Sequence, residues 1–449
     1  MAAISGLILN NEWAKLMKSP KGETDVIVVG SGPGGATVAR DLTKSGKKVV
    51  ILERGDNKPV KGTFKQFANG CFVPGRSLLI TQQALGMVRG LTTGGSSIYY
   101  CGCEFKPLVT MLKSYNIDIA QEVSEIYDEL PTAPLSDELM PPAGQMFLKS
   151  ARELGYDCHK MNKFIYQEKC RASCELCSYG CPYDAKWNAR FFVNEALKDG
   201  AEMVNGAKVD KVIIENGKAI GVEYKHVRKV HRLFAEKTVI AAGGIGSPLI
   251  LRKSGIQGVG YDFFFDPIWF ILGKVKALNE GRGIPMSAVV HLEKDGIVIT
   301  DFNMPHLIKT LFDLEVFQLK KVFSYQNILP IMVKVRDDLG GKITKRGFLS
   351  KKLTDNDWEK LKKGAQISKR ILENLGATEI YKTWLLAAHP GGTVKIGDHL
   401  DENLQTKYRD LYVCDASVFP EKLGVPPTST ILALGKRLAR HLVEVSRGA

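Results

Sequence analysis

A glycine-rich turn between two buried strands constrains this chain more strongly than any other feature of its sequence. Residues 25–30 (DVIVVG) and 48–55 (KVVILERG) contain short β-branched runs without polar alternation, which are typical of buried parallel strands. Between them lies GSGPGGATVARDLTKSG, with a GxGxxG motif where the first strand turns into a helix. This order of strand, tight turn, helix and strand predicts an α/β unit that binds a dinucleotide.

Each position of the motif has a distinct physical role. Gly30 permits the tight turn, Gly32 lets the backbone approach a pyrophosphate, and Gly35 allows the helix to pack closely on the strand. The helix N-terminus faces the phosphates, and Glu53 at the end of the second strand accepts hydrogen bonds from ribose hydroxyls. A purely structural turn would leave Glu53 unexplained, so we expect a bound dinucleotide.

Three further segments indicate which dinucleotide this is. Residues 89–100 (RGLTTGGSSIYY) have paired glycines and serines, and residues 238–256 (TVIAAGGIGSPLILRKSGI) have the pattern of a strand, a glycine turn and a helix. Residues 411–445 follow with a strand ending at Asp415, a loop and a long helix that begins near Pro427. Together these segments resemble the glucose–methanol–choline (GMC) family of flavin oxidoreductases.

The resemblance implies an α/β fold with a Rossmann-type FAD-binding domain and a smaller α+β substrate domain. It divides the chain into an N-terminal extension (1–22), three pieces of the FAD-binding domain (23–105, 196–256 and 385–449), a cysteine-rich lid or hinge (106–195) and the substrate domain (257–384). The family's FAD contacts map onto Gly30, Gly32, Gly35, Glu53, Gly94, Gly95, Ser96, Val209, Asp415 and Ala416. Asp415 would lie at the flavin ribityl chain, and a helix-capping aspartate is the alternative interpretation of this residue.

His389 is the residue that we expect to carry the chemistry. It lies in AAHPGGTVKIG, where the HPxGT pattern matches the catalytic histidine of the family. Oxidising an alcohol to a carbonyl removes a hydroxyl proton while hydride leaves the carbon, and an imidazole that titrates near neutral pH suits this proton transfer. The other seven histidines have no comparable sequence context.

One position departs from the family pattern. The family usually has a second polar residue, His or Asn, about forty residues after the catalytic histidine, and Pro426 stands at this place. The proline side chain has no donor or acceptor. Three alternatives remain open: Lys422, Thr428 or Ser429 substitutes for it, the substrate hydroxyl is held differently, or the enzyme acts on another bond such as C=C.

Four cysteines are concentrated within twelve residues. Cys170, Cys174, Cys177 and Cys181 have the spacing C-x3-C-x2-C-x3-C-P, which is typical of ligands to an iron–sulfur cluster. Zinc usually has two separated CxxC pairs, and only one CxxC occurs here. The spacing therefore predicts a 3Fe–4S or 4Fe–4S cluster, with structural thiols and then zinc as the alternatives. Within the family, some sugar dehydrogenases hold such a cluster, whereas long-chain alcohol oxidases have a related segment without a known one.

The composition limits the partners and the location. The 449 residues include 62 Lys and Arg against 48 Asp and Glu, a net charge of +14, without the aromatic-interleaved basic motif of a nucleic-acid binder. A solvated charged face is the simplest interpretation of this charge, and attraction to an acidic electron carrier or partner subunit, or to anionic lipid headgroups, comes next. Nine cysteines without a recognisable export signal indicate reduced thiols, and no long apolar run occurs. We therefore expect a cytoplasmic protein, with peripheral membrane contact as a second option.

The remaining segments predict the substrate domain. Residues 305–326 have the pattern of an amphipathic helix with Leu307, Leu311, Leu314, Phe317 and Val322 on one face. A helix on a sheet is the simplest interpretation of this pattern, and a lipid-facing or substrate-entry helix is the alternative. Residues 354–376 predict a helix capped by a threonine and ending at Gly376.

The sequence as a whole predicts an FAD-dependent dehydrogenase. Hydride would pass between a CH–OH carbon of a small, alcohol-type substrate and the flavin, and electrons would continue through the iron–sulfur cluster to an external carrier. Two alternatives are a flavin and iron–sulfur reductase that acts on a C=C bond, and an electron-transfer subunit without a substrate of its own.

Overall fold

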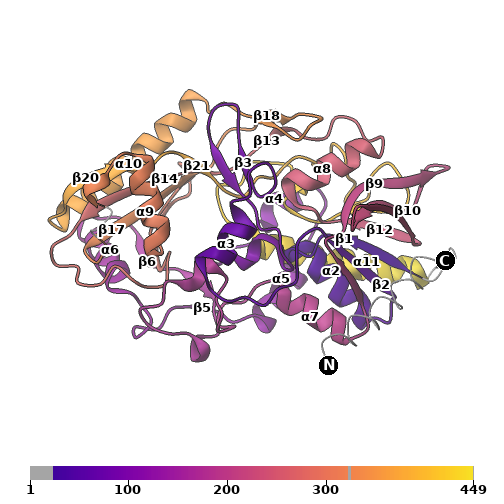
Figure 1. Cartoon of the computed structure of the whole chain (residues 1–449), viewed down its shortest axis with the longest axis horizontal. Helices are drawn as coiled ribbons and strands as arrows, with labels where there is room; N and C mark the ends of the chain where they lie inside the picture. Colours follow the sequence, from indigo (N-terminus) through magenta and orange to yellow (C-terminus); the bar gives the residue numbers. More distant parts are fainter. Residues whose placement is uncertain (1–23, 322–324, 448–449) are drawn as a thin grey trace.

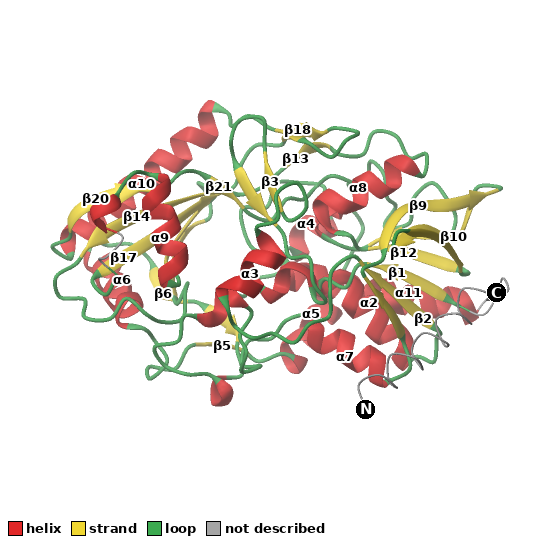
Figure 2. Cartoon of the chain, viewed as in Figure 1, coloured by secondary structure: helices red, strands yellow, loops and turns green. Residues whose placement is uncertain are grey.

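The computed structural model describes residues 24–321 and 325–447, so the expected extension at 1–22 lies outside the described residues. Figures 1 and 2 show two sheet-and-helix regions side by side along the longest axis of the molecule. The region at the right contains both the N-terminal and the C-terminal elements, and the region at the left comes from the middle of the chain.

Within residues 24–321 and 325–447, a parallel sheet of five strands forms the first region. Its order is β22-β12-β1-β2-β8, so segments far apart in the sequence build one sheet. All four neighbouring pairs are parallel, as expected for a Rossmann-type domain. The strands are β1 (Val26–Val29), β2 (Val49–Glu53), β8 (Glu202–Asn205), β12 (Lys237–Ile240) and β22 (Leu411–Val413).

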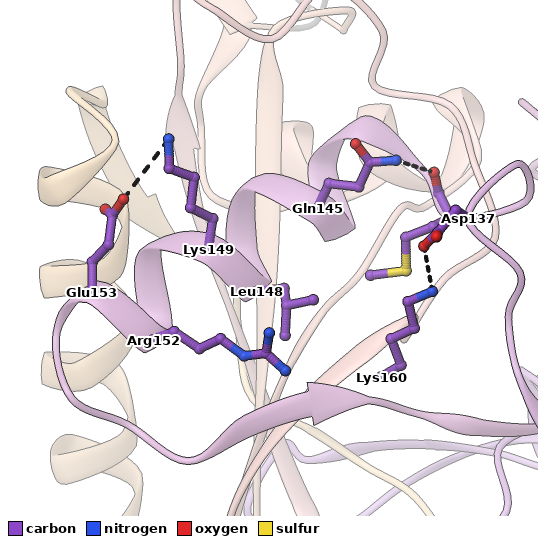
Figure 3. Close-up of a pocket in the computed structure, with 8 residues that line it drawn as sticks. Asp137, Gln145, Leu148, Lys149, Arg152, Glu153 and Lys160 are labelled. Atoms are coloured by element: carbon purple, nitrogen blue, oxygen red, sulfur yellow. Dashed lines mark hydrogen bonds and ion pairs between the residues drawn. The ribbon is translucent and has the colours of Figure 1, made fainter.

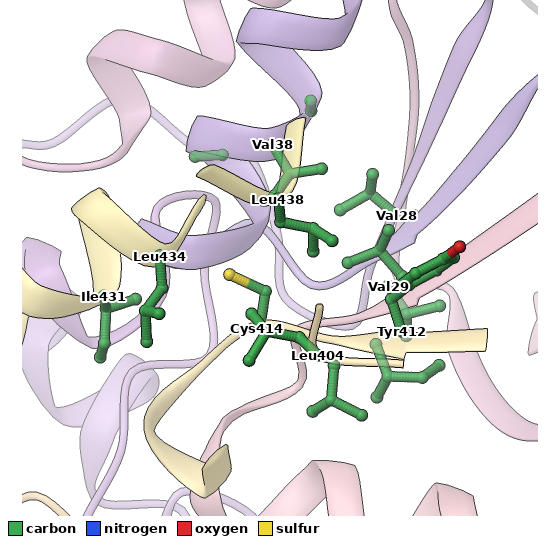
Figure 4. Close-up of a cluster of buried hydrophobic side chains, with 14 of the residues drawn as sticks. Val28, Val29, Val38, Leu404, Tyr412, Cys414, Ile431, Leu434 and Leu438 are labelled. Atoms are coloured by element: carbon green, nitrogen blue, oxygen red, sulfur yellow. The ribbon is translucent and has the colours of Figure 1, made fainter. Parts of the chain in front are cut away.

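Helices cover this sheet and complete its core. Helix α2 (Pro33–Lys44) connects β1 to β2 and packs against α7 (Arg190–Lys198) and α11 (Thr428–Arg447). Figure 4 shows Val28, Val38, Cys414 and Leu438 meeting in the cluster between these elements. The long C-terminal helix therefore lies directly against the helix that follows the glycine motif.

A small antiparallel sheet and helix α8 adjoin this domain. Strand β10 lies between β9 and β11, and β9 contacts α8. The bounds are β9 (Lys208–Glu215), β10 (Lys218–His226), β11 (Lys229–Phe234) and α8 (Gly243–Lys253).

A mixed sheet of nine strands forms the second region among the described residues. Its order is β3-β4-β21-β14-β17-β16-β15-β6, and β20 also pairs with β14. The bounds are β3 (Leu78–Ile80), β4 (Gly86–Val88), β6 (Cys158–Lys160), β14 (Pro267–Lys274), β15 (Ala288–Leu292), β16 (Ile297–Asp301), β17 (Ile328–Val335), β20 (Thr378–Lys382) and β21 (Leu386–Ala387). Thus the sheet takes strands from the expected substrate domain and from segments outside it.

Side chains alternate between the two faces of this sheet. Trp269 and Ile271 of β14 belong to the core beneath α6 (Pro142–Glu153) and α10 (Asp355–Asn374). Phe270 and Leu272 point into a second core, which Ile308 and Phe312 of α9 (His306–Glu315) join. The sheet is therefore covered by helices on both faces.

Shorter elements connect the two regions. The helical ones are α3 (Phe64–Cys71), η1 (Gly95–Ile98), α4 (Val109–Lys113), α5 (Ala120–Glu129), η2 (Gln167–Lys169), η3 (Leu176–Tyr179), η4 (Leu319–Lys321) and η5 (Ala416–Val418). The short strands are β5 (Thr132–Pro134), β7 (Asn162–Phe164), β13 (Tyr261–Phe263), β18 (Gly340–Ile343) and β19 (Leu349–Ser350).

Two of the predicted helices have different outcomes. The helix predicted at 354–376 is confirmed: Thr354 caps α10 in a capping box with Asp357, and Gly376 follows its end with φ of 68°. The helix predicted at 305–326 is too long, because α9 ends at Glu315 and Phe317 has φ of 58°. Leu307, Leu311, Leu314 and Phe317 are exposed, and Val322 lies outside the described residues.

Candidate active site

The glycine motif has the local geometry that a dinucleotide needs. Gly30 has φ of 102°, and a Cβ atom there would lie 2.2 Å from the carbonyl oxygen of Ala241. A Cβ atom on Gly35 would lie 2.1 Å from the carbonyl oxygen of Gly30, whereas one on Gly32 would meet nothing within 4 Å. The expected turn and close packing at Gly30 and Gly35 are confirmed, and open space lies beside Gly32.

The open space at Gly32 fits a pyrophosphate. Gly32 is the N-cap of α2 and has no capping side chain. The predicted second loop lies beside it: a Cβ on Gly95 would be 3.1 Å from the Cα of Gly32, and the Gly94 amide donates to Ser31 Oγ at 3.1 Å. Backbone amides at the N-terminus of a helix attract phosphate, so the arrangement fits the diphosphate of FAD.

Glu53 lies at the carboxyl end of β2, beside this loop. Its Oε2 accepts from the amide and the hydroxyl of Ser31 at 3.0 and 2.6 Å, and its Oε1 accepts from the Gly55 amide at 2.6 Å. Burial raises the pKa of Glu53, and these hydrogen bonds oppose the shift. The ribose contact of Glu53 remains a prediction.

Two other predicted cofactor contacts lie near these segments. Val209 on β9 is two residues beyond Ala207, whose amide donates to the carbonyl oxygen of Glu53 at 2.9 Å. The Ser96 hydroxyl accepts from the Gly90 amide at 3.0 Å, which closes the loop ahead of η1. Both positions remain predictions as contacts of FAD.

Asp415 joins three segments at the carboxyl edge of the parallel sheet. Its carboxylate accepts from Ser247 Oγ at 2.5 Å, from the Gly243 amide at 2.8 Å and from the Ser417 amide at 2.7 Å. The last contact caps η5, so the capping role is present, while the ribityl contact remains a prediction. Burial is the main cause of the raised pKa of Asp415.

The HPGGT loop is fixed against the same edge. The Gly392 amide donates to the Ala416 carbonyl at 3.0 Å, and Thr393 Oγ1 donates to the Gly244 carbonyl at 2.7 Å. Phe264 and Gly391 exchange two backbone hydrogen bonds of 3.2 and 3.1 Å. The HPGGT loop that carries His389 is thus held by Ala416, Gly244 and Phe264.

His389 contacts a buried carboxylate that sequence reasoning missed. Its Nδ1 lies 3.1 Å from Oδ2 of Asp266, which also lies 3.2 Å from Nζ of Lys334. The side chain of His389 is 29% exposed, whereas those of Asp266 and Lys334 are 0% and 1% exposed. A single acid within FFFDP and a single lysine within ILPIMVKV were the available signals, since isolated charges in apolar segments need a partner.

The surroundings of His389 favour its neutral form. Burial lowers the pKa of His389, and the charge of Lys334 lowers it further, while Asp266 opposes both effects. Asp266 itself has a lowered pKa although it is buried, because Lys334 and His389 favour its charged form. An imidazole that remains neutral is able to accept a proton.

The structure shows the contacts of two residues that could substitute for the polar side chain missing at Pro426, namely Lys422 and Ser429. Lys422 pairs with Asp338 at 2.6 Å, so its ammonium group is already engaged. The Ser429 hydroxyl, near the start of α11, is buried and has no hydrogen-bond partner among the described residues. The hydroxyl of Ser417 in η5 is also buried and without a partner there. Unpartnered buried hydroxyls at this edge also fit a site that holds a polar ligand.

The four clustered cysteines are free thiols. Cys177 and Cys181 are buried, while Cys170 and Cys174 are partly exposed. In the described part of the chain, no group of three or more His, Cys, Asp or Glu side chains is placed to hold a metal ion. The four thiols are therefore not gathered into a metal centre in the described residues, and the iron–sulfur site remains a prediction from spacing.

Two cavities lie away from these residues. Figure 3 shows a cavity of about 340 Å³ beside α6, lined by Asp137, Met140, Gln145, Leu148, Lys149, Arg152, Glu153 and Lys160. A second cavity, of about 500 Å³, is lined by Trp269, Trp358, Lys362, Ala365, Gln366 and Lys382. None of the predicted site residues lines either cavity.

The fold and the site define an oxidoreductase of the dinucleotide-binding class, and comparison with known proteins gives its family. A GMC oxidoreductase model matches residues 24–267, more than half of the chain, and a second one matches residues 348–435. The chain therefore belongs to the GMC oxidoreductase family. It is an FAD-dependent oxidoreductase of CH–OH donors, as the resemblance implied.

Individual relatives match over most of this chain. An uncharacterised protein of Methanocaldococcus jannaschii is 29% identical over 93% of this chain and 100% of its own length. Long-chain-alcohol oxidase FAO3 of Arabidopsis thaliana is 24% identical, over 93% of this chain and 68% of its own length.

Solved structures show the same fold. Pyridoxine 4-oxidase from Mesorbium loti superposes with a TM-score of 0.73 at 15% identity, over 93% of this chain and 99% of that one. Formate oxidase of Aspergillus oryzae RIB40 has a TM-score of 0.74 at 16% identity, over 96% and 100%. Among the described helices, none is long and apolar enough to cross a membrane.

Proposed function

We propose that this enzyme is a dehydrogenase in which His389 removes the hydroxyl proton of an alcohol. The observation that carries the proposal is the position of His389, whose loop is held by Ala416 and Gly244 at the edge that carries the glycine motif. Its Nδ1 faces Asp266, so Nε2 is the nitrogen available to a substrate. When bound, FAD supplies the acceptor for the hydride that leaves the same carbon.

The chain's own residues account for binding and proton transfer in this proposal. Gly32, Gly94 and Gly95 hold the diphosphate through their backbone, and Asp415 holds the ribityl chain with Ala416 beside it. His389 accepts the proton at Nε2 while hydride departs. The family usually has two polar residues at this site, and Pro426 stands at the second position and offers no side-chain hydrogen bond. His389 is therefore the remaining polar side chain of the two.

An apolar substrate is favoured by the apolar core that lies beside the His389 loop. Leu386 lies shortly before His389 in the chain, and Val425 follows Gly424, whose amide donates to Asp266. Both Leu386 and Val425 pack against a core rich in methionine and phenylalanine. The flexible members of that core are Met161, Met286, Met304 and Met332, with Phe270, Phe302 and Phe312 around them. Methionine adapts to irregular apolar shapes, so we propose a primary alcohol with a hydrocarbon chain as the substrate class.

Anaerobic flavin bleaching by straight-chain primary alcohols tests this function. His389→Gln should retain flavin but reduce the rate of bleaching on the order of 10²–10⁴-fold. His159→Gln is the matched control, because His159 is exposed on β6 and should leave the rate unchanged. Full bleaching in the His389 variant would place the proton transfer elsewhere. Bleaching only by a redox partner would instead favour an electron-transfer subunit.

We propose separately that reduced flavin is reoxidised through an iron–sulfur cluster by an acidic carrier. The support is the spacing of Cys170, Cys174, Cys177 and Cys181 before Pro182, together with the net charge of +14. Because the side chains do not form a metal site in the described residues, no catalytic step is assigned to this cluster. Measuring iron and acid-labile sulfide in anaerobically prepared protein tests whether the cluster is present.

We also propose peripheral contact with a membrane through α9. Leu307, Leu311 and Leu314 share its outer face and are 44–48% exposed, and Phe317 beyond its end is 85% exposed. The inner residues Ile308 and Phe312 join the apolar core next to the active site. An exposed apolar face above that core would suit the uptake of an apolar alcohol from lipid.

A further inference from the structure

Behind His389 lies a group of buried charges. Oδ2 of Asp266 lies 3.1 Å from Nδ1 of His389 and 3.2 Å from Nζ of Lys334, while its Oδ1 accepts from the Gly424 amide at 3.1 Å. Both oxygens of the carboxylate are therefore engaged by donors. These contacts join the residue before β14, strand β17, the HPGGT loop and the segment before α11.

The backbone holds the two partners in an uncommon conformation. Asp266 has φ of 48° and His389 has φ of 47°, in the left-handed region that residues with a Cβ atom rarely adopt. The paired segment next to them supplies the restraint, because Phe264 and Gly391 exchange two hydrogen bonds and the Ala388 amide donates to Phe265 at 2.9 Å. Strained positions that face one another in this way are frequent at functional sites.

The charged groups around this carboxylate are few and paired. Lys334 faces Asp266 directly from β17. Asp337 accepts from the Asp266 amide at 2.9 Å and pairs with Lys351 at 2.6 Å, so this second carboxylate is balanced by its own cation. Cys103 and His291 also lie near Lys334. Burial raises the pKa of the Cys103 thiol and lowers the pKa of His291, which favours the neutral form of both groups.

The arrangement decides which nitrogen of His389 carries the proton. An ionised carboxylate only accepts hydrogen bonds, so the nitrogen facing Asp266 must be the donor. With the proton on Nδ1, the lone pair of the neutral ring lies on Nε2, on the side away from Asp266. Lys334 opposes protonation of Asp266, which would otherwise allow the reverse arrangement.

We infer that Asp266 is a positioning residue that holds the proton of His389 on Nδ1, and that the charge of Lys334 on the same carboxylate keeps His389 neutral before the reaction. The inference rests on the proposed role of His389. In the reaction, the hydroxyl proton of the substrate moves to Nε2 while hydride leaves to the flavin, and Asp266 stabilises the resulting imidazolium without taking up a proton.

Nitrogen-15 NMR of the FAD-bound protein with labelled histidine tests this without a substrate, and His389→Gln assigns the signal. The wild type should show the Nδ1–H form of His389. Asp266→Asn should lower the pKa of His389 and populate the Nε2–H form, because the carboxylate charge and its obligatory acceptor are lost. Lys334→Met should shift the pKa in the opposite direction, since a nearby positive charge is removed.

Asp313→Asn is the matched control. Asp313 also forms a buried pair with a lysine, at 2.6 Å from Lys309, but it lies on α9 away from the HPGGT loop. This variant should leave the tautomer and the pKa of His389 unchanged. If Asp266→Asn does not fold, the Asp266→Asn/Lys334→Met double variant removes both charges and is measured in its place, with the Nε2–H form again expected.

Kinetics give a second measurement, with 1-dodecanol as the probe in anaerobic flavin reduction. Asp266→Asn should lower the limiting rate by about 100-fold or more with a smaller effect on KM. Lys334→Met should shift the acidic limb of the pH–rate profile to higher pH. An Nε2–H form of His389 in the wild type, or shifts of the same sign in both variants, would overturn the inference. A wild type that shows the Nδ1–H form but is not bleached by any alcohol would contradict the proposed function instead.

Discussion

Single glycines in the nucleotide-binding turn are required for different physical reasons. Gly32 has open space beside it and an ordinary negative φ, so a side chain there is compatible with the fold but would occupy the proposed diphosphate position. A Cβ atom at Gly35 would lie 2.1 Å from a backbone oxygen, which cannot move away without shifting β1.

We expect Gly32→Leu to fold without flavin and Gly35→Ala to be unstable. The first variant should lose the visible flavin absorbance while its far-ultraviolet circular dichroism remains that of the wild type. The second should lose about 3 kcal/mol or more of stability, because the inserted methyl group overpacks the helix against the strand. Flavin retention in Gly32→Leu would contradict the proposed position of the diphosphate.

A buried carboxylate in the second region should make the stability depend on pH. Asp301 accepts from the amides of Ser287 and Ala288 at 2.8 Å each and from Ser287 Oγ at 2.8 Å. Burial nevertheless raises the pKa of Asp301 from 3.8 to about 6. Between about pH 4 and pH 6 the folded state therefore binds more protons at this residue than the unfolded state, so its contribution to stability falls as pH rises.

Comparison of the wild type with Asp301→Asn isolates this effect. Relative to the variant, the free energy of unfolding of the wild type should fall by about 3 kcal/mol as the pH rises from 4 to 7, with little further change above pH 7. Melting temperatures measured at each pH give the difference. A constant difference across this range would show that the carboxyl group titrates normally in the folded protein.

At the scale of elements, α9 separates an apolar core from an exposed apolar surface. Its inner residues Ile308 and Phe312 pack on the sheet, as the simplest interpretation of the sequence required. The face predicted from the periodicity is instead the outer one, with Leu307, Leu311 and Leu314 exposed. The sequence pattern predicted one apolar face, whereas α9 is apolar on both sides.

If this outer face contacts lipid, charge placed on it should weaken binding. Leu311→Glu/Leu314→Glu should reduce cosedimentation with vesicles that contain phosphatidylserine, because two carboxylates would face the lipid. Leu339→Glu is the control, since Leu339 is also exposed but lies beyond β17. Equal binding of the wild type and both variants would argue against contact through α9.

At the scale of the whole molecule, the net charge of +14 should influence the approach of an electron carrier. Reoxidation of the reduced enzyme by an acidic ferredoxin should slow as salt is added, since a Debye length below about 10 Å screens the attraction. Stopped-flow rates at increasing ionic strength measure this. A rate that is independent of salt would contradict electrostatic recruitment of the carrier.

The cysteine segment allows a direct test of the iron–sulfur proposal. Cys177→Ser should lose iron and labile sulfide, whereas Cys158→Ser should keep both, because Cys158 is a buried thiol on β6 outside the segment. Iron and sulfide analysis of anaerobically prepared protein provides the measurement. An iron-free wild type would assign the four thiols a purely structural role.

Local chemistry made the nucleotide-binding part of this chain readable from its sequence. The turn at Gly30, the close packing at Gly35, the cap at Thr354 and the strand that ends near Asp415 all depend on a few neighbouring residues with strong conformational preferences. The GMC fold followed from these motifs, and the family models confirm it.

Contacts between distant segments were decided only by the tertiary structure. Asp266 meets His389 because residues 264 and 391 pair across 127 positions of sequence, and Lys334 reaches them from a third strand. Hydrophobic periodicity also could not tell which side of α9 faces the sheet, because both sides are apolar. A sequence specifies which residues need a partner, but the partner of a buried charge is fixed by packing across the whole fold.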